Sequence, residues 1–365
     1  MTNNKINIAV IGGGFSNERS VSLNTSKKIF SVLSKKKYNI FLVEISKEKK
    51  WILKNQPEVS NSKRALVTTD LSKKITPFSN SLSKAEYMGS ILKDIDVAFI
   101  ALHGKNGEDG KIQAVLDLLG IPYTGSGVLA SALGMNKIKC LEIVSSHGIK
   151  VPNCMPVYLN ANTNIGVIKK DVLRKIGYPC IVKPNESGSS IGVSLVKNER
   201  SLKKSLEAAF KEDDLVLIEE YISGREFTCG VLGNTNKTEL ISLPPVEIIV
   251  NEESFFDYHN KYHTEKIKEV CPPMIGKELN NKILKTSKKI HEILGCDGLS
   301  RSDFILADKN RQLYFLEINT IPGQTETSLC PKEAKAMGWS FPEFIDKQIM
   351  LALNKNAKKK NINKL

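Results

Sequence analysis

The order of elements near the N-terminus constrains the fold more than any other feature of this sequence. Residues 6–11 form a short, mainly apolar run that ends at three consecutive glycines, and helical periodicity follows over residues 18–33. A second apolar run spans residues 38–45. Two strands joined by a helix are expected to lie parallel in one sheet, because a tight turn connects only antiparallel strands. The pattern therefore predicts an α/β domain at the start of the chain.

This first domain is expected to span residues 1–125. A buried strand at residues 96–102 and a short strand at residues 121–125 complete its predicted sheet. Residues 46–90 are rich in Lys, Ser and Asn, and we interpret them as an insertion with little core of its own. A chain of 365 residues is longer than one core usually requires, so further domains are predicted.

Two α+β units are predicted to follow. Residues 126–223 combine helical segments, short strands and a glycine-serine loop. Residues 224–354 have more strand character and end in an amphipathic helix near residues 342–353. The basic residues 355–365 have no apolar periodicity, so this tail is predicted to be disordered.

The composition is that of a globular protein. Hydrophobic residues make up 41% and charged residues 25% of the chain, and no apolar run is long enough to predict a membrane helix. The polar residues 1–7 lack the apolar segment of a signal peptide. The seven cysteines are scattered without a Cys-x-x-Cys pair, which favours reduced thiols. A cytoplasmic protein without membrane contact is expected.

The net charge of +14 raises the question of a nucleic-acid partner. The lysines are spread along the whole chain, and no basic stretch is interleaved with aromatic residues that stack on bases. Solvated lysine-rich faces and an anionic substrate explain the charge better. No nucleic-acid partner is expected.

The glycine turn at residues 12–14 begins like the dinucleotide-binding pattern Gly-x-Gly-x-x-Gly. Glu44 even stands where such folds place an acid that binds ribose. The third glycine of the pattern is replaced by Asn17, however. The phosphate loop Gly-x-x-x-x-Gly-Lys-Ser/Thr is absent as well. A nucleotide would therefore be bound in another way.

The strongest chemical signal is a predicted antiparallel hairpin formed by residues 299–306 and 312–318. Side chains two residues apart on a strand share one face. With the turn centred near Asn310, polar side chains from both strands meet on one patch. The predicted pairs are Asp303 opposite Glu317 and Arg301 opposite Asn319.

This patch has the chemistry of a magnesium site. Magnesium takes oxygen ligands, typically one or two carboxylates together with phosphate oxygens. A neighbouring arginine can stabilise a phosphoryl group during transfer. A solvated face with salt-bridged residues is the alternative interpretation. Tyr314, Leu316 and Ile318, on the other face, are expected to point into a core.

Two segments of the middle unit are candidates for nucleotide contacts. Lys183 ends a predicted strand, and the glycine-serine loop at residues 188–192 follows it. Such a loop can cover phosphates with backbone N–H groups, although it can also be a simple turn. Residues 218–222 form a strand-to-linker segment that can bind adenine and ribose at its edge.

Together these motifs resemble those of the ATP-grasp ligases, in which two α+β units clamp ATP, and more closely those of the D-alanine–D-alanine ligases. The matching motifs occur in the family's order: GGGFSNERSVSLNTS, ALHGKNGEDGKIQAVLDLLGIPYTGSGVLASALGMNK, VKPNESGSSIGVS, LIEEYISGREF, FDYHNKY, RSDF and LEINTIPGQTETSLCP. The resemblance covers most of the chain outside residues 46–90 and the tail. It implies ATP and D-alanine as substrates, two magnesium ions that manganese can replace, and a homodimer.

The resemblance also implies roles for residues that bind ATP. Lys137 and Lys183 would contact its phosphates, and Lys261 would reach the γ-phosphate from a mobile loop. Glu219 and Glu226 would contact adenine and ribose.

By the same resemblance, Asp303, Glu317 and Asn319 would hold the two magnesium ions. Arg301 and the backbone N–H of Gly323 would stabilise the tetrahedral intermediate.

The remaining implied roles concern the two D-alanines. Glu18 would bind the ammonium group of the first, and His103 would lie near its carboxylate. Ser328 and Leu329 would bind the carboxylate of the second. A hydrogen-bonded link that closes the site would consist of Glu18, Ser189 and Tyr262. Taken singly, His103 could instead be a loop histidine, Glu18 a helix-terminal carboxylate and Tyr262 a packing aromatic.

The chemistry implied by the resemblance has two steps. The carboxylate of one D-alanine attacks the γ-phosphorus of ATP, and the amine of the second displaces phosphate from the acyl phosphate. Water would destroy that intermediate, so residues 251–268 are interpreted as a lid.

Two alternatives to this function remain at this point. A relative that joins D-alanine to D-lactate or D-serine belongs to the same enzyme class. Lys261 and Tyr262 favour the dipeptide, although His263 follows them directly. A phosphate- or nucleic-acid-binding protein without catalytic activity is the alternative from another class.

Overall fold

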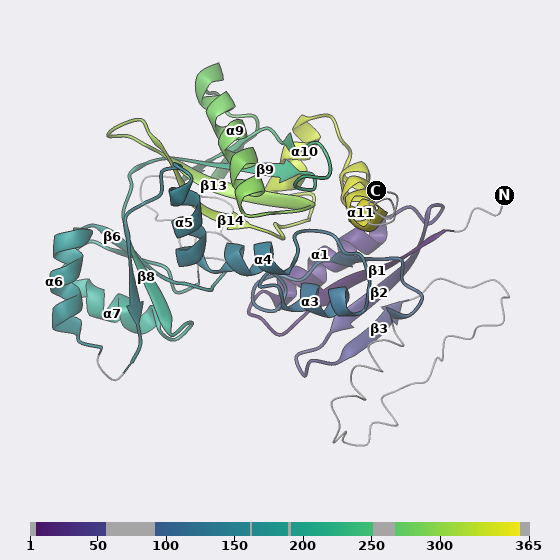
Figure 1. Ribbon diagram of the computed structural model, residues 1–365, viewed down its shortest axis with the longest axis horizontal. Coiled ribbons are helices and arrows are strands. Elements are labelled where there is room, and N and C mark those ends of the chain that lie inside the picture. The colour runs from purple at the N-terminus through teal and green to yellow at the C-terminus, as the bar shows by residue number, and fades with distance from the viewer. Residues whose placement is uncertain (1–4, 56–91, 161–162, 189–190, 251–266, 358–365) are drawn as a thin grey trace, which may run out of the picture.

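A computed structural model describes residues 5–55, 92–160, 163–188, 191–250 and 267–357. Within these residues the strands form three sheets, and each sheet takes its strands from one consecutive stretch of the chain. The first and second sheets lie at opposite ends of the molecule, with the third above and between them (Figure 1). None of the helices in this part of the chain is long and apolar enough to cross a membrane.

The first sheet confirms the predicted parallel arrangement. β1 pairs in parallel with β2 and with β4, and helix α1 connects β1 to β2. β3 adds to β2 in the antiparallel sense, so the order is β3-β2-β1-β4. The elements are β1 (Ile6–Gly13), α1 (Arg19–Val32), β2 (Tyr38–Ile45), β3 (Trp51–Asn55), β4 (Val97–Ile100) and α3 (Lys111–Leu118). Residues 56–91, most of the predicted insertion, lie outside the described residues.

The glycine turn after β1 is filled by an arginine of the chain itself. Arg19 donates hydrogen bonds to the carbonyl oxygens of Gly14 (2.6 Å) and Ile45 (2.5 Å). Its guanidinium also lies 2.7 Å from the carboxylate of Glu44. A Cβ at position 12 would collide with the side chain of Ser26 in α1, so Gly12 allows the helix to pack closely on β1. Glu44 is therefore used for an internal ion pair.

The second sheet is antiparallel and has the order β5-β8-β6-β7. Helices α6 and α7 cover it, and Val172, Leu202 and Leu206 pack with its strands in one buried core. The elements are β5 (Cys154–Tyr158), α6 (Ile165–Lys175), β6 (Cys180–Pro184), β7 (Ser194–Val196), α7 (Glu199–Ala209) and β8 (Leu215–Glu220).

The third sheet has the order β12-β11-β9-β13-β14, and β10 also pairs with β9. Its strands are antiparallel to their neighbours. The elements are β9 (Gly224–Leu232), β10 (Ile241–Ser242), β11 (Val246–Val250), β12 (Ile267–Val270), α9 (Lys277–Ile293), β13 (Leu299–Ala307), β14 (Leu313–Asn319) and α10 (Leu329–Ala336). All seven cysteines of the chain are free thiols.

Three helices pack away from the units to which their sequence positions assign them. Helices α4 (Val128–Met135) and α5 (Lys137–Ser146) share their core with α9, β13 and β14, although they fall within predicted residues 126–223. Helix α11 (Phe341–Ala357) places Ile345 and Ile349 against the first sheet. Periodicity shows that these helices have apolar faces, but it cannot show which sheet those faces cover.

A β-bulge corrects the predicted core face of the hairpin. Asp303 pairs with Glu317 and Phe304 pairs with Phe315, so Leu316 has no partner in the β13–β14 ladder. Because of this extra residue, the side chains of β14 that precede it point to the face opposite to the one that strict alternation predicts. Phe315 and Ile318 are therefore buried, whereas Tyr314 and Leu316, expected in the core, are only partly buried.

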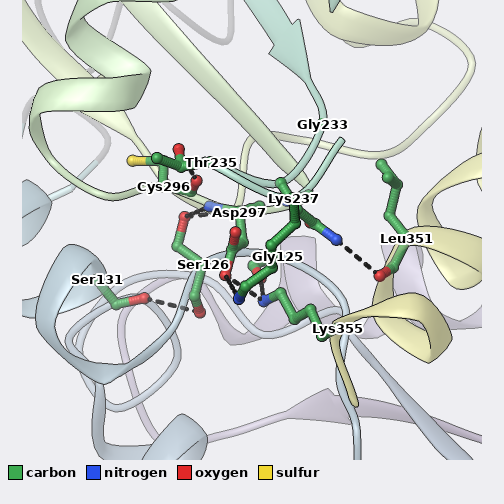
Figure 2. Close-up of polar contacts among 12 residues, drawn as sticks. Gly125, Ser126, Ser131, Gly233, Thr235, Lys237, Cys296, Asp297, Leu351 and Lys355 are labelled. Carbon is green, nitrogen blue, oxygen red and sulfur yellow. Dashed lines mark hydrogen bonds and ion pairs between the residues drawn. The ribbon is translucent and has the colours of Figure 1, made fainter. Parts of the chain in front are cut away.

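The predicted start of the disordered tail is wrong, because helix α11 continues through residue 355 to Ala357. The ammonium group of Lys355 lies 3.3 Å from the carboxylate of Asp297 and donates to the carbonyl oxygen of Gly125. It also lies 5.2 Å from the ring centroid of Tyr123. Figure 2 shows Lys355 reaching the segments around Gly125 and Asp297. Residues 358–365 lie outside the described residues.

We expect Lys355→Ala to destabilise the protein by about 1–3 kcal/mol, because it leaves a buried carbonyl and a partly buried carboxylate without this donor. Lys237, 3.7 Å from Asp297, would remain as a partner. Thermal unfolding measures the effect, and Asn354→Ala, at an exposed neighbour in the same helix, is the control. Equal unfolding temperatures for both variants would contradict this role of Lys355.

A buried histidine is hydrogen-bonded to the beginning of β13, the first strand of the hairpin. His291 of α9 is fully buried, with Nδ1 2.7 Å from the hydroxyl of Ser300 and Nε2 3.2 Å from the carbonyl oxygen of Gly233. Burial lowers the pKa of His291 to about 4, although the hydrogen bond to Gly233 opposes the shift. A neutral ring donates from Nε2 to Gly233 and accepts from Ser300, so both contacts are satisfied without a charge.

The stability of the protein should consequently depend on pH through His291. The folded-state pKa is depressed, so the neutral ring contributes fully above pH 6.5 and its contribution falls as the pH drops towards 4. The expected loss is about 1.4 kcal/mol for each pH unit within that interval. Chemical denaturation at several pH values gives the free energy of unfolding as a function of pH. This free energy should depend less on pH in His291→Gln than in the unmodified protein, and equally in His147→Gln, which changes an exposed site. The same pH dependence in the unmodified protein and both variants would refute this role.

Candidate functional site

A cavity between the three units is lined by four of the residues singled out from the sequence: Lys137, Lys183, Glu317 and Asn319. It is open to solvent, and its volume together with the solvent at its mouth is about 650 Å³. Its walls come from the loop after β4, helices α4 and α5, strand β6 with the loop after it, and strand β14. Polar groups in its lining include Glu108, Lys137, Lys183, Ser187, Glu317 and Asn319.

Lys137 is the first residue of α5 and points its ammonium group into this cavity. Asn136 caps the helix by accepting the N–H of Lys139, which fixes the start of α5 beside the glycine-serine loop. Lys137 Nζ donates to the carbonyl oxygen of Ser187 (2.6 Å) and lies 3.8 Å from Glu317 Oε2. Burial lowers the pKa of Lys137, although the carboxylate of Glu317 opposes this.

Lys183 and Glu219 form a buried ion pair on the adjacent strands β6 and β8. Lys183 Nζ lies 2.8 Å from Glu219 Oε2, and both residues are less than a tenth exposed. Burial alone would lower the pKa of Lys183, but the carboxylates of Glu219 and Glu317 together raise it. The cavity wall therefore carries a charged lysine held close to two acids.

The predicted register of the hairpin is confirmed. Arg301 pairs with Asn319, and Asp303 pairs with Glu317. The guanidinium of Arg301 donates two bonds of 2.8 Å to the two carboxylate oxygens of Asp303. Thr228, from β9, donates a further bond of 2.6 Å to Asp303. The pKa of Arg301 is raised, because Asp303 outweighs the opposing effect of burial.

These hairpin side chains fit a magnesium ion that is shared with phosphate. In the described residues no cluster of three or more His, Cys, Asp or Glu side chains forms a complete metal site. The hairpin instead offers two carboxylates and the amide of Asn319, whose Nδ2 lies 3.2 Å from Asp303. Magnesium commonly takes one or two protein carboxylates and completes its shell with phosphate and water. Glu317 and Asn319 line the cavity, where such oxygens would lie.

Glu226 lies on β9 beside the hairpin. Its ladder partner on β13 is Ile305, and Thr228, two residues along, pairs with Asp303. Burial raises the pKa of Glu226 to about 7, and the carboxylate of Asp303 adds to the effect. A carboxyl group with this pKa can accept or donate a hydrogen bond near neutral pH.

The carboxylate of Glu18 lies between two loops that belong to different sheets. Glu18 directly precedes α1, in the first unit. A Cβ on Gly104 would collide with its Oε2 atom, and a Cβ on Gly188 would lie 2.6 Å from it. Both positions therefore require glycine for this approach. Gly188 is the first residue of the predicted phosphate loop at residues 188–192, so the contact joins the first unit to that loop.

His103 is buried in the loop after β4, between a carboxyl group and a hydroxyl group. Its Nδ1 lies 3.5 Å from Glu108 Oε1, and its Nε2 lies 3.2 Å from Thr25 Oγ1. Burial raises the pKa of Glu108, although the hydrogen bond with His103 opposes the shift. Glu108 is not among the residues predicted from the sequence. An acid five residues after His103, in the same glycine-rich loop, was the available signal.

Ser328 and Leu329 stand at the N-terminus of α10. The hydroxyl of Ser328 lies 2.8 Å from that of Thr325 and accepts the N–H of Thr325 at 3.1 Å. Leu329 is the first helical residue, where backbone N–H groups lack helical acceptors and attract anions. A Cβ on Gly323 would lie 2.9 Å from Ser328 Oγ, so the turn holding Gly323 packs closely on this end of the helix.

Three predicted site residues lie outside the described residues: Ser189, Lys261 and Tyr262. The same is true of residues 251–266 of the predicted lid.

Comparisons with known proteins agree with this arrangement. The family model described as D-ala D-ala ligase N-terminus matches residues 7–126, and that described as D-ala D-ala ligase C-terminus matches residues 143–350. A D-alanine–D-alanine ligase of Carboxydothermus hydrogenoformans is 37% identical over 351 residues, which cover 96% of this chain and 99% of the relative. One of Flavobacterium johnsoniae is 37% identical over 349 residues, with coverage of 95% and 99%.

Solved structures with similar folds include two ligases. The VanG D-Ala:D-Ser ligase from Enterococcus faecalis matches with a TM-score of 0.76 and 31% identity, covering 96% of this chain and 100% of that chain. The D-alanine–D-alanine ligase from Bacillus anthracis complexed with ATP matches with a TM-score of 0.74 and 30% identity, covering 97% and 99%. The fold and the cavity are thus those of an ATP-grasp enzyme. Within that class, the chain belongs to the D-alanine–D-alanine ligase family.

We expect Glu317→Gln to reduce ATP turnover by roughly 100-fold or more, the scale seen when a preorganised electrostatic group is removed. The substitution keeps the side chain's shape and removes its charge. Thermal stability without nucleotide should change little, because Glu317 is 38% exposed and its ammonium partner is 3.8 Å away. Glu278→Gln, on the exposed side of α9, is the control. Near-normal turnover by Glu317→Gln would mean that the hairpin is only structural.

Proposed function

We propose that this protein joins two D-alanines in an ATP-dependent reaction and so supplies a dipeptide for peptidoglycan precursors. One observation carries the proposal. Two buried lysines and the Asp303–Glu317–Asn319 hairpin face a single cavity, and the Glu18 carboxylate approaches the glycine-serine loop that borders it. Phosphate-binding cations, oxygen ligands for magnesium and a carboxylate for an ammonium group are therefore collected around one space.

The lysines are suited to the phosphates of ATP. Lys137 loses solvation in the cavity wall, and its partners are a backbone carbonyl and the more distant Glu317. A phosphate oxygen near this ammonium group would replace the lost solvation with a direct charge interaction. We propose that Lys183 acts in the same way, while Glu219 and Glu226 bind adenine and ribose. Lys261 is proposed to reach the γ-phosphate.

The hairpin is suited to phosphoryl transfer. Two magnesium ions held by Asp303, Glu317 and Asn319, or manganese in their place, would offset charge on the transferring phosphate. Arg301 contributes a positive charge, and its two hydrogen bonds to Asp303 fix the orientation of its planar guanidinium. This guanidinium and the backbone N–H of Gly323 are proposed to stabilise the tetrahedral intermediate.

The two amino-acid subsites are assigned to two groups of residues, one around Glu18 and His103 and one at the N-terminus of α10. Glu18 binds the ammonium group of the first D-alanine, and His103, oriented by Glu108, lies near its carboxylate. The N-terminus of α10, with the hydroxyl of Ser328 and the N–H of Leu329, binds the second carboxylate. The link formed by Glu18, Ser189 and Tyr262 is proposed to close the site.

The chemistry then proceeds in two steps. The carboxylate of the first D-alanine attacks the γ-phosphorus, and ADP leaves, which gives D-alanyl phosphate. The amine of the second D-alanine, after losing a proton, attacks the carbonyl carbon, and inorganic phosphate leaves. Both steps depend mainly on positioning and on the charges placed around the phosphate.

We further propose that the enzyme works in the cytoplasm as a homodimer. The proposed reaction consumes ATP, which the cytoplasm supplies. The free thiols are consistent with a reducing compartment.

The direct test is phosphate release from ATP by the purified protein with magnesium. We expect rapid release only when D-alanine is added, because the first step requires a carboxylate acceptor held by the first subsite. L-alanine is the matched control, since it differs only in handedness. Equal turnover with L-alanine would contradict the proposal that the enzyme is specific for D-alanine.

The same reaction mixture distinguishes the close alternatives. The similarity to a D-Ala:D-Ser ligase makes D-serine the competitor to examine first, followed by D-lactate. Chromatography of the products should show mainly D-alanyl-D-alanine at pH 7.5. A majority of D-alanyl-D-serine or D-alanyl-D-lactate would reassign the second substrate and leave the ligase chemistry in place.

A further inference from the structure

A buried carboxyl group on α10 has no part in the site described above. Glu333 is 0% exposed. Its Oε2 atom accepts the backbone N–H of Gly230 at 3.0 Å, and its Oε1 atom has no hydrogen-bond partner among the described residues. Burial raises the pKa of Glu333 to about 8, and the positive charge of Arg301 opposes the shift. The group is therefore mostly protonated at neutral pH and can remain buried without a partner of opposite charge.

The structure of β9 explains why a side chain is needed here. On the side of β9 away from β13, β11 pairs with residues 226–228 and β10 pairs with residues 231–232. Gly230 lies at the break between these two strands. Its carbonyl oxygen accepts the N–H of Leu243, but its N–H is bonded by Glu333 in place of a strand. A buried N–H without an acceptor is costly, so Glu333 replaces a missing ladder bond.

The absence of a side chain at Gly230 is also needed for this contact. A Cβ at this position would lie 2.5 Å from Glu333 Oε2 and 2.8 Å from the side chain of Leu243. Only glycine therefore lets the carboxyl group reach the strand.

The bond connects two elements that carry residues of the proposed site. Gly230 is the ladder partner of Arg301 on the neighbouring strand β13. Glu333 lies five positions after Ser328, in the helix whose N-terminus carries Ser328 and Leu329. One hydrogen bond thus joins helix α10, which is proposed to bind the second substrate, to Gly230, the backbone partner of Arg301.

We propose that Glu333 is a positioning residue for the second amino-acid substrate. Its bond to Gly230 fixes the N-terminus of α10 relative to Arg301, and so sets the distance between the bound carboxylate and the group that stabilises the reacting centre. This inference rests on the proposed ligase function and adds a residue to it. The helix is also held by packing of Cys330 and Ala334 and by the neighbouring pair Lys332–Glu269. Packing is not directional, and that pair is partly exposed, so neither fixes the helix end as a buried hydrogen bond does.

The test uses three variants of the full chain and separates the two D-alanine sites kinetically. Initial rates over a wide range of D-alanine concentrations give a Michaelis constant for D-alanine at each of the two sites. The KM for ATP is measured separately. Glu333→Leu removes the acceptor and should raise the second-site constant about 10-fold, the value of one buried hydrogen bond. The first-site constant and the KM for ATP should stay unchanged. Glu333→Gln keeps an oxygen for the Gly230 N–H and should restore near-normal values. Lys335→Ala, at an exposed site on the same helix, is the control.

Each outcome decides the proposal. A Glu333→Leu protein with a lower unfolding temperature but unchanged substrate constants would show a purely structural role and overturn it. A Glu333→Gln protein as impaired as Glu333→Leu would also overturn it, because the acceptor would then not be the cause. Should Glu333→Leu fail to fold, Glu333→Asp withdraws the carboxyl group by one methylene and must raise the second-site constant. Absence of D-alanine-dependent turnover in the unmodified protein would refute the proposed function and this inference together, whereas normal turnover with insensitive variants would refute the inference alone.

Discussion

The arrangement of the site depends on two lysine ammonium groups buried in the wall of one cavity. Lys137 and Lys183 are each less than a tenth exposed, and burial of a cation is costly unless negative charge lies nearby. Glu219 and Glu317 supply part of that charge. Lys137 retains a lowered pKa, so its charge is incompletely compensated. A polyphosphate is the ligand that such a wall favours, and the neighbouring hairpin offers oxygen ligands for the metal ions that accompany it.

Close approaches between side chains and the backbone also shape the surroundings of this cavity. Glycines at positions 104 and 188 admit the Glu18 carboxylate between the first sheet and the glycine-serine loop, and glycine at position 230 admits Glu333 to β9. The Glu18 contact joins units whose sheets are separate, so this part of the site exists only when the units are packed together (Figure 1). Lys355 adds a further bond at the seam, between α11 and the segment at Gly125 (Figure 2).

Local patterns in the sequence predicted what alternation and element order determine. The parallel first sheet and the pairing of Asp303 with Glu317 follow from spacing alone, and the structure confirms both. The bulge at Leu316 was missed because one unpaired residue leaves the composition of a strand unchanged. Helix α11 was ended too early because Lys355 looks like a solvated lysine until its partners, Asp297 and Gly125, are brought next to it by the fold. Glu333 was missed for the same reason, because its contact with Gly230 is distant in the sequence. Glu108 was missed although its partner, His103, lies only five residues before it.

The central claim is that this cavity activates a D-alanine carboxylate by phosphorylation. Oxygen transfer measures this step directly. D-alanine labelled with ¹⁸O in its carboxylate is incubated with the protein, magnesium and unlabelled ATP, and the released phosphate is analysed by mass spectrometry. The account predicts that each phosphate formed with the dipeptide carries one labelled oxygen, because the oxygen that attacks phosphorus leaves with it. Unlabelled phosphate accompanying dipeptide formation would contradict the account.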